Sequence, residues 1–121
     1  MVNLSKSKYC ALWQCPKMLW LRKYKPELAE VDSHTLSIME TGNAVGDLAM
    51  GLFGDFTEVT VYTDGEIDLS AMVRRTQEEI AKDTPVICEA SFEWNGLYCA
   101  VDILRREDDG WAIYEVKTST S

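Results

Sequence analysis

Charged side chains interrupt apolar, strand-like segments at four positions in the last third of the chain: Glu89, Asp102, Glu115 and Lys117. Asp102 lies inside the apolar run of residues 97–104, and Glu115 and Lys117 stand two positions apart. Since alternate residues of a strand leave the same face of a sheet, Glu115 and Lys117 are expected to point the same way. Carboxylates and an ammonium group would thus meet on one sheet.

A predicted β-hairpin brings two of these acids together. Asn95–Gly96 is typical of a two-residue type I′ turn, which places Trp94 opposite Leu97. Counting back along both strands then places Glu89 opposite Asp102. Like charges that face each other across two strands destabilise a sheet unless a cation or a water-filled groove relieves their repulsion. The pair therefore indicates a site that binds a cation or opens to water.

A second predicted hairpin decides which side chain lies opposite Asp102. If residues 107–110 form the loop, Asp102 lies opposite Glu115, whereas a two-residue loop at 109–110 places it opposite Lys117. In either register the side chains of Asp102, Glu115 and Lys117 lie on the same face of the sheet. A three-residue loop with a bulge would change the register.

The chemistry that these residue types predict is metal-dependent. Mg²⁺ or Mn²⁺ takes one or two protein carboxylates and completes its shell with water and substrate phosphate. Asp102 and Glu115 are the expected metal ligands, and Glu89 is a third ligand or holds a metal-bound water. Lys117 is the expected catalytic lysine, which orients or deprotonates the water or neutralises charge on the phosphorane. The predicted reaction is in-line phosphodiester hydrolysis.

The same side chains also have a plain structural interpretation. On an exposed antiparallel face they would form surface ion pairs worth about 0 to 1 kcal/mol each. Asp102 weighs against this, because the apolar residues on both sides of it predict a covered strand, where an unpaired carboxylate is costly. Both interpretations stay open at this point.

Length and composition indicate one globular domain. The chain has 121 residues, of which 46% are hydrophobic, enough to form a core. No apolar run approaches the roughly 20 residues of a membrane span, and the N-terminus lacks the apolar region of a secretory signal, so we expect a cytoplasmic protein without a membrane partner. The four cysteines are expected to be buried thiols, because Cys88 and Cys99 fall at different heights on their strands.

Charge is distributed unevenly around a net charge of -8. Residues 1–26 contain no Asp or Glu, and residues 27–121 hold all 20 acidic residues. A solvated helix face would explain the basic segment, but beside a carboxylate cluster it could also bind phosphates. The candidate nucleic-acid-binding residues are Lys6, Lys8, Lys17, Arg22, Lys23 and Lys25.

Helices and strands are predicted along the whole chain. Ser5 or Ser7 caps a first helix that Pro16 breaks, and a second turn of helix follows. Further on, the pattern predicts a helix over 36–53 started by Ser33 or Ser37, an edge strand over 57–63, a helix capped by Asp68 or Ser70, and strands over 86–94, 97–105 and 111–117. The predicted fold class is α/β (α+β), a mixed sheet with antiparallel hairpins flanked by helices.

Two of these elements have a predicted core side. The apolar stripe of the long helix is formed by Val45, Leu48, Ala49, Leu52 and Phe53. The core side of the first long strand is formed by Val86, Cys88, Ala90, Phe92 and Trp94. Gly42 and Gly46, four apart on one side of the helix, are expected to allow close packing.

The order of these elements, the Asn95–Gly96 hairpin, Val101-Asp102-Ile103 and Glu115-Val116-Lys117 resemble the PD-(D/E)XK nuclease superfamily, in which an acid and a (D/E)xK motif lie on adjacent central strands. The likeness is greatest to the RecB-like branch. That branch includes the CRISPR-associated RecB-like exonucleases and an uncharacterised group of bacterial proteins with this nuclease-like region at the N-terminus. Residues 4–21, LSKSKYCALWQCPKMLWL, look like the opening of that branch.

The resemblance implies a fold and a set of roles. It implies a single nuclease-like domain over residues 1–121 with a restriction-endonuclease-like core, acting on DNA or, alternatively, RNA. Asp102 and Glu115 would hold Mg²⁺ or Mn²⁺, Lys117 would be the catalytic lysine, and Glu89 the acid on the preceding strand.

The chain departs from the pattern of the branch in three places. Gly46 stands where the branch often has the histidine of a Gly-x-x-x-His motif, so that histidine cannot serve as a metal ligand here. Cys15 matches the first cysteine of the iron–sulfur clusters in some relatives, but the other cysteines lack the required spacing, so no cluster is expected in this chain. The chain ends at Ser121, directly after the third core strand, where the family continues. It is therefore expected to be the N-terminal fragment of a longer protein and to form a homodimer through the sheet edge or face left uncovered.

Two other functions stay open beside hydrolysis. One is a catalytically incomplete nuclease-fold module that binds nucleic acid or a protein partner without turnover. The other is a small metal-binding or redox domain built on the cysteines.

Overall fold

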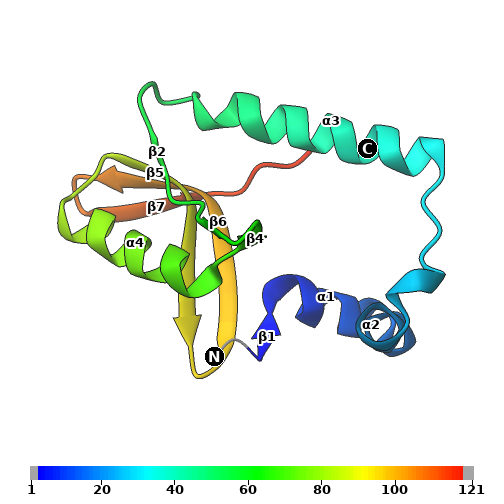
Figure 1. The fold of residues 1–121 in the computed structure, drawn as a ribbon. Coiled ribbons are helices and arrows are strands. Elements are labelled where there is room, and N and C mark those ends of the chain that lie inside the picture. Colours follow the sequence, from blue (N-terminus) through cyan, green and yellow to red (C-terminus); the bar gives the residue numbers. More distant parts are fainter. Residues whose placement is uncertain (1–2, 119–121) are drawn as a thin grey trace.

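The computed structural model describes residues 3–118, which form a mixed sheet with helices around it (Figure 1). The elements follow one another along the chain as β1 (Leu4–Ser5), α1 (Lys6–Gln14), α2 (Pro16–Tyr24), a 3₁₀ turn η1 (Pro26–Leu28), α3 (Ser33–Met50), β2 (Thr57–Glu58), β3 (Tyr62–Thr63), β4 (Glu66–Ile67), α4 (Leu69–Ala81), β5 (Val86–Trp94), β6 (Leu97–Glu107) and β7 (Gly110–Tyr114).

The strand β6 organises the main sheet. It pairs antiparallel with β5 along one side. On its other side the parallel strand β1 covers its first two residues, and the antiparallel strand β7 covers residues 103–107. The short strand β2 adds to β5 in parallel. This combination of parallel and antiparallel pairs, with helices around it, confirms the predicted α/β (α+β) class and mixed sheet.

The β5–β6 hairpin has the predicted register. Asn95–Gly96 adopts positive φ at both residues (49° and 79°), as a type I′ turn requires, and Trp94 pairs with Leu97. The same count places Glu89 level with Asp102, and the pairing of the two strands is interrupted only at this position. The predicted juxtaposition of the two acids is therefore present, at a local break in the ladder.

Side-chain alternation along β5 reverses at Glu89. Val86 and Cys88 pack in one apolar cluster, together with the end of α3, whereas Ile87 packs in a second cluster. Ala90 should rejoin the first cluster but packs with Ile87 instead. Glu89 has a left-handed backbone (φ 61°), which turns the residues after it to the opposite face. The prediction of one uninterrupted core side for this strand is therefore wrong beyond Cys88.

Side chains and a proline fix where the first helices begin. The Oγ of Ser5 accepts a hydrogen bond from the Lys8 N–H at the start of α1 (3.3 Å), and Pro16 is the first residue of α2, both as predicted. The helix α3 begins at Ser33, one of the two predicted starting residues, and its N-cap is Asp32. Its carboxylate accepts a hydrogen bond from the Thr35 N–H at 2.8 Å, which satisfies one of the free donors of the first turn.

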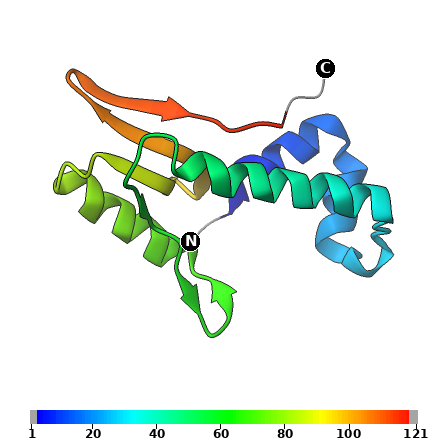
Figure 2. The ribbon, with the colours of Figure 1, turned by 90° about the horizontal axis from the view of Figure 1, so that it is seen from above.

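The long helix α3 packs on the sheet only near its C-terminal end. Ala49, Met50 and Phe53 pack against the cluster beneath it, whereas Leu48 and Leu52 point away, and Leu48 is 82% exposed. The predicted stripe is therefore displaced around the helix. The first half of α3 extends beyond the sheet (Figure 1, Figure 2). No helix in the described part of the chain, α3 included, is long and apolar enough to cross a membrane.

Two predicted strands are shorter in the structure. The strand expected over 57–63 is divided into β2 and β3, and β3 pairs with β4 in a separate hairpin. The last strand ends at Tyr114, so the segment that carries Glu115 and Lys117 is no longer paired. The β6–β7 register, continued by one residue, still places Glu115 level with Asp102, as predicted for the longer loop.

All four cysteines are free thiols, as predicted. Only Cys88 is buried, Cys99 is half-buried, and Cys10 and Cys15 are exposed. The expectation that they are buried is therefore correct for Cys88 alone.

Candidate functional site

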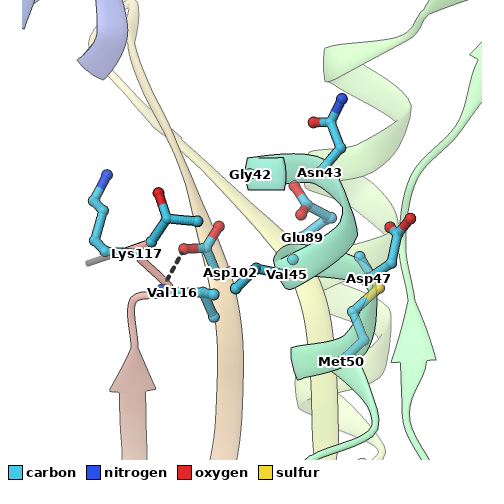
Figure 3. Close-up of a pocket in the computed structure, with 11 residues that line it drawn as sticks. Gly42, Asn43, Val45, Asp47, Met50, Glu89, Asp102, Val116 and Lys117 are labelled. Carbon is cyan, nitrogen blue, oxygen red and sulfur yellow. Dashed lines mark hydrogen bonds between the residues drawn. The ribbon is translucent and has the colours of Figure 1, made fainter. Parts of the chain in front are cut away.

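A cavity of about 580 Å³ opens between α3, the β5–β6 pair and the segment that follows β7 (Figure 3). One wall comes from α3, and each of the two strands contributes one acid. The lining residues are Gly42, Asn43, Val45, Gly46, Asp47, Met50, Glu89, Asp102, Val116, Lys117 and Thr118. Three of the four predicted catalytic and metal-binding residues, Glu89, Asp102 and Lys117, thus lie around one cavity.

Asp102 joins the segment after β7 to the sheet. Its Oδ2 accepts a hydrogen bond from the Val116 N–H at 2.8 Å, the dashed line in Figure 3. The side chain is half-buried at a place where neither β1 nor β7 pairs with β6. The carboxylate therefore replaces a strand–strand hydrogen bond, and it positions the next residue, Lys117, at the cavity.

The surroundings of Glu89 disfavour the ionised form of its carboxyl group. Burial raises the pKa of its carboxyl group, and the nearby charges of Asp102 and Glu58 raise it further. Its left-handed backbone is also unfavourable for a residue with a Cβ, by about 1 to 2 kcal/mol. Such strained residues cluster at functional sites, and here the strain sets an acid into the wall of a cavity.

Glu115 lies beside the cavity and does not line it. Its Oε1 is 3.0 Å from the Lys6 Nζ and 3.3 Å from the Lys117 Nζ. These two lysines, Lys6 first, lower the pKa of the Glu115 carboxyl group. Glu115 stands level with Asp102 in the continued β6–β7 register, but it is ion-paired with two lysines. Glu115 is connected to the site through Lys117.

The wall formed by α3 holds polar residues that the sequence prediction missed. Asn43 and Asp47, one turn apart, both line the cavity. A Cβ added at Gly42 or Gly46 would meet nothing within 4 Å, so these glycines do not serve close packing as expected. The spacing of these glycines was the signal in the sequence that could have indicated a cavity wall here. Two glycines on one side of a helix allow either close packing or an open space beside the helix.

The predicted phosphate-binding cations of α1 and α2 are all exposed. Lys8, Arg22 and Lys23 line a second cavity, of about 300 Å³, between the two helices. Lys6 lies apart from them, because it is paired with Glu115. Among the described residues, Lys6 is thus the cation of the basic segment that is ion-paired with an acid beside the larger cavity.

The donors around the larger cavity suit a hard divalent cation bound in part by its substrate. Glu89 and Asp102 are two carboxylates with mutually unfavourable charge, and Mg²⁺ is commonly bound through one or two carboxylates plus phosphate and water. Within residues 3–118, no group of three or more His, Cys, Asp or Glu side chains lies close enough together to hold a metal ion. The described carboxylates therefore form no complete protein cage, and Glu89 and Asp102 could hold such an ion only together with water or substrate oxygens.

Comparison of the chain with protein-family models, with curated proteins and with solved structures finds no match.

Proposed function

We propose that this chain is a nuclease-fold domain that hydrolyses phosphodiester bonds of DNA with Mg²⁺ or Mn²⁺, with RNA as the alternative substrate. One observation carries the proposal. Glu89, Asp102 and Lys117 come from three separate segments and line the same cavity, and Glu89 is held there by a backbone conformation that residues with a Cβ rarely adopt. The resemblance to the RecB-like PD-(D/E)XK nucleases supports the same roles.

The residues that line the cavity would have different roles in hydrolysis. Asp102 and Glu89 would hold the divalent ion, which supplies Lewis-acid stabilisation and lowers the pKa of a bound water. Asp102 also orients the segment after β7 through the Val116 N–H, so that the Lys117 ammonium group is presented where a phosphate would bind. Glu115 becomes available as a further ligand when its ion pairs with lysine open.

A second function, nucleic-acid binding without turnover by the same fold, is favoured by the state of Glu115. Two lysines neutralise this carboxylate, and it does not line the cavity. A nuclease site without its second metal ligand would still present cations to phosphates. Metal binding and cleavage, measured separately, distinguish the two functions.

Calorimetric titration with Mn²⁺ tests the metal site, using Asp102→Asn with Asp109→Asn as the matched control. An amide oxygen at position 102 can still accept the Val116 N–H, so we expect Asp102→Asn to preserve folding and weaken Mn²⁺ binding tenfold or more. Asp109 lies in the exposed β6–β7 turn, and its substitution should change nothing. Equal Mn²⁺ affinities for the two variants would refute the metal site.

Cleavage of single- and double-stranded DNA and RNA with Mn²⁺ tests the chemistry. Lys117→Ala should lower the rate at least a hundredfold, because it removes an ammonium group that acts on the transition state. Lys82→Ala is the control, since Lys82 pairs with Glu79 on α4. Mn²⁺ binding without cleavage in the wild-type chain would favour the binding module instead.

A further inference from the structure

Two consecutive helices carry a cation and two aromatic residues at the same spacing. In α1 these are Lys6, Tyr9 and Trp13, and in α2 they are Lys17, Trp20 and Tyr24. Residues three and four apart on a helix lie on the same face, so each helix presents one stripe in which a cation is followed by an aromatic pair. The proposed site of hydrolysis makes no use of these aromatic residues.

The aromatic side chains lie in solvent instead of in the core. Trp13 is 75% exposed and Trp20 is 52% exposed, and Tyr9 and Tyr24 are about half exposed. The rings of the α1 pair meet edge to face with centroids 6.3 Å apart, and those of the α2 pair are tilted with centroids 5.2 Å apart. Exposed ring faces of this kind are suited to stack on another flat, apolar group.

Positive charge surrounds the aromatic pairs, and among the cations of the two stripes and the cavity between them only Lys6 has an acidic partner in the described residues, Glu115. Residues 1–26 contain no Asp or Glu. Lys8, Arg22 and Lys23 line the cavity between α1 and α2, and no carboxylate of residues 3–118 forms an ion pair with any of them. Lys23 also lies 5.3 Å from the ring centroid of Tyr24. The surface thus complements a polyanion that carries flat, exposed bases.

We infer that α1 and α2 form a binding surface for single-stranded nucleic acid. Unpaired bases would stack on the Tyr9–Trp13 and Trp20–Tyr24 pairs, and the phosphates would contact the neighbouring cations. A duplex keeps its bases stacked on each other, so it cannot offer them to these rings. The α1 stripe begins at Lys6, which binds Glu115 beside the cavity, so a strand held on α1 would lead toward Lys117.

This inference rests on the proposed function and adds the form of nucleic acid that is bound. Binding is measured in EDTA, which removes divalent metal ions, so the result for binding does not depend on whether the chain hydrolyses nucleic acid. The probe is a fluorescent 12-nucleotide oligo(dT), followed by anisotropy. We expect Trp13→Ala and Trp20→Ala each to weaken binding roughly 5- to 100-fold, the range for removal of one base–aromatic stack. Trp94→Ala is the matched control, because Trp94 is an exposed tryptophan (71%) that lies at the β5–β6 turn and belongs to neither helix.

Competitors separate stacking from charge alone. An abasic oligonucleotide and a 12-base-pair duplex should compete weakly, and Lys8→Ala with Arg22→Ala should flatten the salt dependence of log K by about 0.7 for each phosphate that the variant no longer neutralises. Equal binding by Trp13→Ala, Trp20→Ala and Trp94→Ala, or equal competition by inorganic polyphosphate, would overturn the inference. So would tighter binding to vesicles of anionic lipid than to oligo(dT). If the wild-type chain sediments as a dimer and the two tryptophan variants sediment as monomers, the rings bind a second copy of the chain and the inference is wrong.

Discussion

The backbone at Glu89 is the local feature on which the candidate site depends. A residue in the ordinary β region would continue the alternation of β5, whereas the left-handed φ of 61° places the carboxylate in the cavity beside Asp102. The conformation and the buried charge are both unfavourable for folding. The fold therefore tolerates a local loss of stability at a residue that lines the cavity.

Removing the charge of Glu89 should stabilise the protein in a pH-dependent way. Burial, Asp102 and Glu58 raise the pKa of Glu89 in the folded state. Its destabilising effect is therefore absent below the pKa of the unfolded chain, grows as the pH rises through the folded pKa, and is complete above it. We expect Glu89→Gln to raise the free energy of unfolding by up to about 1 kcal/mol at pH 8 and to leave it unchanged at pH 3.5.

Urea unfolding at the two pH values checks this prediction. Glu78→Gln, an exposed change on α4, controls for the general loss of one negative charge. If both variants shift stability equally at both pH values, the environment of Glu89 has no effect on its ionisation.

At the scale of elements, one buried hydroxyl joins α4 to β5 close to the reversal. The Thr76 Oγ1 donates to the Met72 carbonyl oxygen and accepts from the Ser91 N–H, both at 2.8 Å. Thr76 is fully buried, and Ser91 lies two residues beyond Glu89. The helix thus supplies a hydrogen bond that fixes the strand where its side chains have just changed faces.

Replacing this hydroxyl by a methyl group should destabilise the whole fold. Thr76→Val keeps the volume but leaves the buried Ser91 N–H without an acceptor, so we expect a loss of about 1 to 3 kcal/mol in the free energy of unfolding. Thr76→Ser keeps the hydroxyl and should lose about 1 kcal/mol or less through its missing methyl group. Equal stability of the two variants in urea would show that the hydrogen bond contributes nothing.

Turn and cap chemistry made much of the fold predictable. Asn95–Gly96 set the β5–β6 register, and with it the meeting of Glu89 and Asp102, because a type I′ turn allows one pairing. Ser5 and Pro16 located the first two helices. The orientation of α3 was not predictable, because Leu48 and Ala49 are both apolar and only tertiary packing decides which of them faces the sheet.

The candidate site was predictable only where local sequence determines it. Strand alternation failed at Glu89, since nothing in the sequence marks a left-handed glutamate. The sequence also could not indicate that Glu115 pairs with Lys6, a residue 109 positions away along the chain. Asp47 was missed because its role depends on where α3 crosses the sheet.

At the scale of the whole molecule, the thiol of Cys88 should report opening of the core. Burial, reinforced by Glu58, Glu89 and Asp102, raises its pKa to about 11, so its reactive thiolate is scarce at pH 8. In a chain with the other three cysteines changed to serine, we expect labelling of Cys88 to be a hundredfold or more slower than that of the exposed Cys10 in the matching single-cysteine chain.

Mass spectrometry of the labelled protein over time gives both rates. Thr76→Val, introduced into the Cys88 chain, should accelerate its labelling by the same factor as it raises the equilibrium constant of unfolding. Rapid labelling of Cys88 in the wild-type fold would mean that the cluster beneath α3 opens without unfolding.

The strands β1 and β7 pair with the same edge of β6, but β7 is close to β6 in the sequence and β1 is far from it. The turn that joins β6 to β7 is short, so β5, β6 and β7 can assemble from sequence neighbours, whereas β1 reaches Leu97 only after almost the entire described chain has been closed into a loop. Contacts of such long range form late and at a high entropic cost. The helices α1 and α2 should accordingly be the last part to dock during folding and the first to detach, while the β5–β6–β7 meander persists without them.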